Sequence, residues 1–202
     1  MHRFKQKTAN RDADSVKTVA AARPAERIMV QVVDVSQSFA VNPMIAVAIA
    51  KFARLDVIVN NASVYEAGEP ADISDERWQA FADANGVFLG CRAAISYLEK
   101  TRGVIINASV SGTGGDWGMS PYNAAKGAVV NLTGPCRSIS SKRGIRVNSV
   151  CPSLTRTGMI EDMLKDEKRL RSSRSASGSA WSTNRREWLP SSPFRRARAP
   201  VS

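Results

Sequence analysis

The chain is poor in the residues that many catalytic and structural metal sites require. Its 202 residues contain one histidine, His2, and three cysteines, Cys91, Cys136 and Cys151, which form no CxxC pair. A lone histidine far from every other motif argues against histidine-based catalysis and histidine-rich metal sites. An odd number of dispersed cysteines argues against a disulfide framework. These shortages disfavour most hydrolases, and we predict no metal site.

The chain also lacks a long hydrophobic run. Its most apolar stretch, residues 40–53, is too short for a bilayer, which needs about 20 apolar residues. Within it, Asn42 and Pro43 predict a helix cap followed by a first-turn proline. The first twelve residues have no apolar core of a secretory signal. We therefore expect one cytoplasmic domain without a membrane partner.

Positive charge is plentiful but unevenly placed. The formal net charge is +11, and residues 168–202 hold nine basic side chains against one acidic. This stretch is rich in Arg, Ser and Pro and has no apolar periodicity. We therefore predict a folded domain over residues 1–167 and a disordered basic tail over residues 168–202. A genuine appendage or an out-of-frame reading of a GC-rich gene would each give this composition. Aromatic residues are sparse there, so specific nucleic-acid binding is the least favoured function.

Limited proteolysis tests the predicted tail. Trypsin should cut the arginine sites beyond residue 167 in the first minutes of digestion and leave one larger fragment. The physical reason is that basic side chains with few acidic partners repel one another and expose the backbone to the protease. Survival of Arg171 and Arg186 for as long as the arginines of the domain would contradict the prediction.

Strand and helix patterns alternate along residues 28–151. We predict strands at residues 28–35 (IMVQVVDV), 56–62, 103–109 and 145–151, and helices at 42–52, 74–100 and 121–140. Ser74, followed by two acidic residues, is a typical helix start. Alternation of this kind predicts the α/β class, with a doubly wound parallel sheet of the Rossmann type.

Three side chains point to proton transfer. Tyr122 and Lys126 are four residues apart on one helix face, where an ammonium group can lower the pKa of a phenol and make it a proton donor near neutral pH. Ser109 ends the apolar run GVIINAS thirteen residues before Tyr122, and strand ends are where such sheets carry their chemistry. The alternatives are a solvated helix face for the pair, a merely structural strand-end serine, and Ser111 as a rival of Ser109.

In this order the motifs resemble those of the short-chain dehydrogenase/reductase family. The similarity covers about residues 29–164, through QVVDVS, RLDVIVNNA, GVFLGCRAAI, GVIINASVSG, YNAAK and GIRVNSVCPSLTRTGM. It implies an NAD(P)-dependent oxidoreductase that acts on a small alcohol or ketone and forms homo-oligomers. Two other functions stay open, a non-catalytic truncated relative and a protein that binds partners through its basic tail.

The resemblance also implies catalytic roles. Tyr122 would exchange a proton with the substrate oxygen, Lys126 would lower the pKa of Tyr122 and bind the nicotinamide ribose, and Ser109 would hydrogen-bond the substrate oxygen. Asn85 is the candidate for the asparagine that anchors a water relay. It directly precedes Gly86, whereas the family usually places this asparagine three residues before that glycine. Two missing residues rotate an α-helix by about 200°.

The implied cofactor contacts are spread along the chain. They are Asp34 and Val35 at the adenine, Asn60, Asn61 and Ala62 beside the adenosine and ribose, Pro152 and Thr157 in the last motif, and again Tyr122 and Lys126. Asn10 and Arg11 stand near the position that selects between NAD and NADP. An arginine there can pair with a 2′-phosphate, which favours NADP slightly over NAD. Ser63 and Ser153 replace glycines that are usual in the family.

Two family features are not recognisable. A glycine-rich TGxxxGxG turn, whose backbone amides hold the cofactor pyrophosphate, is not found before residue 28. A final strand with a DGG-like turn is not found after residue 164. We therefore expect an incomplete Rossmann-type sheet that lacks its first and last strands.

Overall fold

The computed structural model describes residues 24–64, 68–75, 78, 83–109 and 118–152. Their centre is a sheet of three parallel strands in the order β1–β2–β3. The strands are β1 (Val57–Asn60), β2 (Val104–Ala108) and β3 (Arg146–Val150). The predictions for Asn10, Arg11 and Thr157 and for the basic tail lie outside the described residues.

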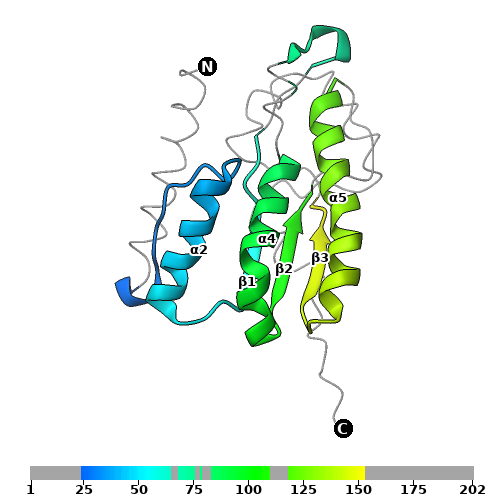
Figure 1. Cartoon of the computed structure of the whole chain (residues 1–202). Coiled ribbons are helices and arrows are strands. Elements are labelled where there is room, and N and C mark those ends of the chain that lie inside the picture. The colour runs from blue at the N-terminus through cyan, green and yellow to red at the C-terminus, as the bar shows by residue number, and fades with distance from the viewer. Residues whose placement is uncertain (1–23, 65–67, 76–77, 79–82, 110–117, 153–202) are drawn as a thin grey trace.

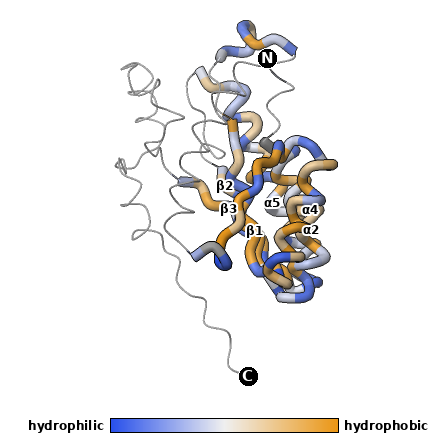
Figure 2. The backbone as a smooth tube through the Cα atoms, turned by 90° about the vertical axis from the view of Figure 1, so that its left-hand side faces the viewer, coloured by the Kyte–Doolittle hydropathy of each residue, from blue (hydrophilic) through white to orange (hydrophobic). Residues whose placement is uncertain are grey.

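Three helices cover one face of this sheet (Figures 1 and 2). They are α2 (Ser38–Phe52), α4 (Asp83–Thr101) and α5 (Ser120–Ser141). Two short 3-10 helices, η1 (Ala25–Arg27) and η2 (Pro70–Asp72), precede α2 and α4. Parallel strands cannot be joined by tight turns, so α4 crosses from β1 to β2 and α5 from β2 to β3.

The core lies between the sheet and these helices. The side chains of β1 alternate, so that Ile58 is buried while Val57 and Val59 are exposed. The buried cluster consists of Ile45, Ile58, Val87, Cys91, Ala94, Leu98, Ile105, Val129, Ile145 and Val147. Figure 2 shows the hydrophobic strands packed against the helix layer. No helix in the described ranges has the length and apolarity to cross a membrane.

Most of the predicted elements are confirmed. The observed β1, β2 and β3 lie inside the ranges predicted for the last three strands. The α5 helix matches its predicted range to within one residue at each end. Helix α4 ends one residue beyond the helix predicted at residues 74–100 but begins at Asp83, and most of the residues between Asp75 and Asp83 lie outside the described ranges. At the predicted start near Ser74, the N–H of Trp78 donates to the Ser74 carbonyl at 2.8 Å, which is the bond of a helical turn. The predicted α/β class with a parallel sheet is also confirmed.

The predicted strand at residues 28–35 was wrong. The backbone is extended at Ile28, but the segment contains no strand and pairs with none of the three described strands. The Val32 side chain is 93% exposed. A strand needs a neighbouring backbone to satisfy its N–H and C=O groups, and none of the described strands provides one for this segment. Apolar alternation alone therefore overestimated the sheet.

The predicted start of the helix at residues 42–52, which is α2, was also wrong. The α2 helix begins at Ser38, with Gln37 as its N-cap, so Pro43 lies inside the helix rather than in its first turn. A proline there removes the N–H that would bond to the carbonyl of Phe39. Val41 and Ile45 are both buried, Ile45 belongs to the core cluster, and α2 packs against α4, which together favour the longer helix. Tertiary packing thus overrides the local capping signal.

Candidate active site

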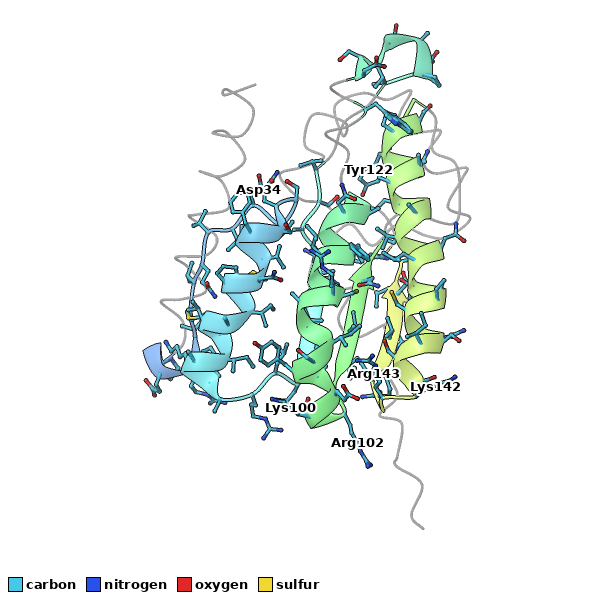
Figure 3. The ribbon with its side chains drawn as sticks, viewed as in Figure 1. Asp34, Lys100, Arg102, Tyr122, Lys142 and Arg143 are labelled. Carbon is cyan, nitrogen blue, oxygen red and sulfur yellow. The ribbon has the colours of Figure 1, made fainter. Side chains whose placement is uncertain are left out.

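The predicted proton-transfer residues meet where β2 ends and α5 begins. Ser109 follows β2 directly, and its N–H donates to the Val150 carbonyl at 2.9 Å, which extends the pairing of β2 with β3 by one residue. Tyr122 lies in the first turn of α5. Figure 3 shows Tyr122 and Asp34 at the same end of the molecule. The C-terminal ends of parallel strands, where chemistry is expected, form this end.

Local sequence explains where α5 starts and which face it buries. Gly118 has a φ of +66°, a backbone conformation that glycine adopts without strain, and Pro121 stands in the first turn, where its missing N–H costs nothing. The buried residues then recur with helical spacing. They are Tyr122, Ala125, Lys126, Val129 and Thr133. The stripe therefore carries two polar catalytic candidates into the interface with β2.

Ser109, Tyr122 and Lys126 are all buried, with 0%, 6% and 3% of their surfaces exposed. The Ser109 Oγ donates a hydrogen bond of 2.7 Å to the backbone carbonyl of Lys126. The Lys126 Nζ lies 3.4 Å from the Ala108 carbonyl oxygen and 5.5 Å from the centre of the Tyr122 ring. The structure thus brings the three residues together, and an exposed helix face for Tyr122 and Lys126 is excluded.

A buried polar network lies directly below these residues. The Asn107 Nδ2 donates to the Thr133 Oγ1 at 3.0 Å, and the Asn60 Nδ2 donates to the Asn107 Oδ1 at 2.9 Å. Thr133 in turn donates to the Val129 carbonyl at 2.8 Å. The network joins β1, β2 and α5. Buried amides and hydroxyls that are paired in this way avoid a large desolvation cost and fix the relative positions of their elements.

Helix α4 contributes Cys91 and Gly90 to the same region. The Cys91 Sγ accepts from the Asn60 Nδ2 at 3.6 Å. Burial, with a smaller contribution from Cys136, raises the pKa of Cys91 to about 12, so the thiol stays neutral and is a poor nucleophile. A Cβ at Gly90 would overlap the Asn60 Oδ1. Glycine therefore lets α4 approach the end of β1 closely.

The predicted adenine contacts sit at the N-terminal end of α2. Asp34 is exposed, and its Oδ1 accepts from the Ser36 N–H at 3.0 Å and from the Ser36 Oγ at 2.7 Å. Val35 is half-buried, and a Cβ at Gly86 would lie 3.1 Å from its Cγ2. The first part of α4 thus packs closely on Val35, and Asp34 stands beside it at the surface.

The other predicted cofactor contacts differ in exposure. Asn61 and Ala62 are exposed directly after β1, and Pro152 is half-buried after β3. Asn60 instead turns its side-chain amide into the buried network. These residues lie at or just after the C-terminal ends of their strands, as the sequence predicted for a ligand site in this type of sheet. Their contacts with a cofactor stay predictions.

Asn85 lies apart from the buried residues of α4. Its side chain is exposed, whereas that of Val87, two residues later, is buried. Two residues correspond to about 200° around an α-helix, so the two side chains point in nearly opposite directions. The helix runs from Asp83 to Thr101, so its turns hold Asn85 in this register. A water-relay role for Asn85 stays a prediction.

Asn107 and Thr133 were not predicted from the sequence as residues of the site. Asn107 could have been noticed, because a single amide interrupts the apolar run from Val104 to Ala108 and must be satisfied if the strand is buried. Thr133 gives no comparable signal, since threonine is common in exposed helix positions.

Four basic residues stand at the end of the molecule opposite to Tyr122 (Figure 3). They are Lys100, Arg102, Lys142 and Arg143.

Comparison with known proteins agrees with this geometry. The short chain dehydrogenase family model matches residues 4–168. Meso-2,3-butanediol dehydrogenase from Serratia marcescens is 46% identical over 149 residues, which are 72% of this chain and 59% of the relative. A 3-oxoacyl-[acyl-carrier-protein] reductase from a Synechocystis strain is 37% identical over 156 residues, which are 75% of this chain and 62% of the relative.

A solved structure shows the same fold. It is a short-chain dehydrogenase from Streptomyces avermitilis, with a TM-score of 0.66 and 25% identity, covering 72% of this chain and 55% of that chain. The present chain therefore spans less than two thirds of the length of this protein and of both curated relatives. The match over residues 4–168, together with the shared fold, assigns the chain to the short-chain dehydrogenase family.

Proposed function

We propose that this protein is an NAD(P)-dependent oxidoreductase that interconverts an alcohol and a carbonyl compound, with Tyr122 as its general acid and base. The observation that carries the proposal is the joint burial of Ser109, Tyr122 and Lys126 at the C-terminal edge of a parallel sheet. The Lys126 Nζ lies 5.5 Å from the centre of the Tyr122 ring, so an amine and a phenol stand together beside the end of β2. The arrangement therefore suits proton exchange between Tyr122 and a substrate oxygen.

In reduction, Tyr122 gives its phenolic proton to the substrate oxygen as negative charge develops there. Ser109 must then turn its hydroxyl from the Lys126 carbonyl, where it lies at 2.7 Å, toward the same substrate oxygen. Lys126 lies beside the phenolate that results. In oxidation the proton moves in the opposite direction. A bound nicotinamide supplies or accepts the hydride, and the protein residues handle the proton.

The described residues fit part of such a cofactor. The Lys126 ammonium, 3% exposed beside the end of β2, is a donor suited to ribose hydroxyls, and Asn61 and Ala62 are exposed at the end of β1. Asp34 is exposed at the position proposed for the adenine side. The Asn10 and Arg11 pair favours NADP. The described residues include no glycine-rich turn for the pyrophosphate.

That missing turn favours a second candidate, a family member that binds cofactor weakly and does not turn over. We keep this alternative because pyrophosphate binding depends on closely approaching backbone amides, which glycine permits. A location in the cytoplasm and assembly into homo-oligomers belong to the same proposal as the enzyme. So does the expectation that the partners are small molecules rather than membranes or specific nucleic acids.

Oxidation of a small alcohol tests the proposal. The name of the Serratia relative suggests 2,3-butanediol as the first substrate, followed by other secondary alcohols. We expect the chain, at several millimolar NAD or NADP, to form reduced nicotinamide slowly, as followed by absorbance. Ser109→Ala should reduce the rate by about a hundred-fold to a thousand-fold, the usual effect of losing one oxyanion donor. Equal measurable rates for the two proteins would refute the role of Ser109, and no product from either would support the non-catalytic alternative.

A further inference from the structure

Besides the 3.4 Å contact of the Lys126 Nζ with the Ala108 carbonyl, two hydrogen bonds hold α5 against β2 and its continuation at two levels. The bond nearer the start of α5, called the upper bond, runs from the Ser109 Oγ to the Lys126 carbonyl at 2.7 Å. The bond two residues earlier on the strand, called the lower bond, runs from the Asn107 Nδ2 to the Thr133 Oγ1 at 3.0 Å. Ser109 and Asn107 are two residues apart on a strand and share one face, and Lys126 and Thr133 are two helical turns apart and also share one face. Two separated bonds resist both sliding and rotation of the helix.

The upper bond uses a group that the proposed reaction needs elsewhere. One hydroxyl proton cannot be donated to the Lys126 carbonyl and to a substrate oxygen at the same time. When Ser109 engages a substrate, the upper bond must therefore break. The lower bond involves no group of the reaction and can persist.

The lower bond is well suited to hold α5 when the upper bond is broken. Asn107 is fully buried and Thr133 is 8% exposed, so water does not compete strongly for either side chain. The Asn107 Oδ1 is itself fixed by the Asn60 Nδ2 at 2.9 Å, and the Thr133 hydroxyl is fixed by the Val129 carbonyl at 2.8 Å. These hydrogen bonds therefore fix the position of α5 relative to β2 and, through Asn60, relative to β1.

From this geometry we propose that Asn107 and Thr133 are positioning residues, which hold Tyr122 and Lys126 in place against β2 when Ser109 leaves the Lys126 carbonyl to bind substrate. The inference rests on the proposed function, because it assigns Ser109 to the substrate. It predicts a specific dependence: loss of the Thr133 hydroxyl matters most when the Ser109 hydroxyl is also absent from the Lys126 carbonyl.

Tyrosine NMR of the complete chain tests this dependence without cofactor or turnover. Ser109→Ala breaks the upper bond permanently, and Thr133→Val breaks the lower bond while keeping the shape of the side chain. The signal is the ring carbon bonded to the hydroxyl in labelled tyrosine, assigned with Tyr122→Phe and followed through a pH titration. If α5 moves outward, the Lys126 ammonium gains water and its effect on the Tyr122 phenol weakens.

We expect the Ser109→Ala/Thr133→Val double variant to raise the Tyr122 titration midpoint by about half a pH unit or more, which makes the phenol about three-fold less acidic. Each single variant should shift it by less than half of that amount, because the other bond remains. Ser109→Ala/Thr133→Ser, which restores a hydroxyl, should titrate like Ser109→Ala alone. A double variant whose shift equals the sum of the single shifts would overturn the proposal.

Two controls separate positioning from general loosening. Tyr97 lies on α4 and packs against the same core, so its midpoint should stay unchanged in every variant. Ser140→Ala removes a buried hydroxyl of α5 that has no hydrogen-bond partner among the described residues, and it should leave Tyr122 unchanged. Equal shifts at Tyr97 and Tyr122, or an effect of Ser140→Ala as large as that of the double variant, would show that the core loosens as a whole and would overturn the positioning role.

The outcome is separable from the enzymatic proposal. A chain that shows the coupled shift but forms no reduced nicotinamide would refute the proposed activity and leave the two-level attachment of α5 as a structural fact. A chain that is active but shows no coupled shift would refute the positioning role alone.

Discussion

The 202-residue chain should bind NADPH and NADH with dissociation constants in the millimolar range or weaker, as measured by fluorescence titration. In the family the glycine-rich turn gives two or three charge-assisted backbone hydrogen bonds, each worth roughly 1.5 to 3 kcal/mol, and a helix dipole adds roughly 0.3 to 1 kcal/mol. A discounted loss of about 4 kcal/mol weakens affinity by nearly a thousand-fold. Micromolar binding, the reference in this comparison, would then become millimolar.

A chimaera provides the control for this prediction. A glycine-rich strand, turn and helix taken from the Serratia relative and fused before residue 24 should restore much of the lost affinity, because it supplies the missing amide donors. A thermal melt of each protein shows whether weak binding reflects the site or an unstable fold. A cooperative melt of the unmodified chain together with a low micromolar dissociation constant would refute the prediction.

Tyr122→Phe should lower turnover by about a hundred-fold to ten-thousand-fold in a chimaera that binds cofactor, while cofactor affinity changes only a few-fold. Proton transfer from a positioned side chain is worth about this much in rate, and phenylalanine keeps the ring that packs at the start of α5. Steady-state rates and fluorescence titration measure the two effects separately. Lys126→Ala should impair both, because the ammonium is proposed to serve both phenol and ribose.

Tyr97→Phe is the matched control for that variant. It makes the same chemical change in a half-buried tyrosine of α4. Tyr97 has no proposed part in proton transfer. Its rate should stay within a few-fold of the parent. If Tyr122→Phe retained a rate similar to that of Tyr97→Phe, the general acid would have to be another group, and the assignment of Tyr122 would fail.

Several features could be predicted because they depend on residues close together in the sequence. The apolar run that became β2 is rich in β-branched residues, and the run beginning at Pro121 has a proline start and a helical stripe. The pairing of Tyr122 with Lys126 follows from helix geometry alone. The strand at residues 28–35 failed because pairing requires a second backbone, whose presence a local pattern cannot report.

The sequence by itself determined the family, the order of the elements and the three residues proposed for proton transfer. Only the tertiary structure decided that Lys126 is buried, that Ser109 donates to its carbonyl, and that Asn85 faces outward. It also revealed the bonds from Asn107 to Thr133 and to Asn60, which join positions 26 and 47 residues apart. The physical reason is that helix and strand patterns follow from backbone geometry within a few residues, whereas a buried polar side chain takes whichever partner the packing of distant elements places within hydrogen-bond distance.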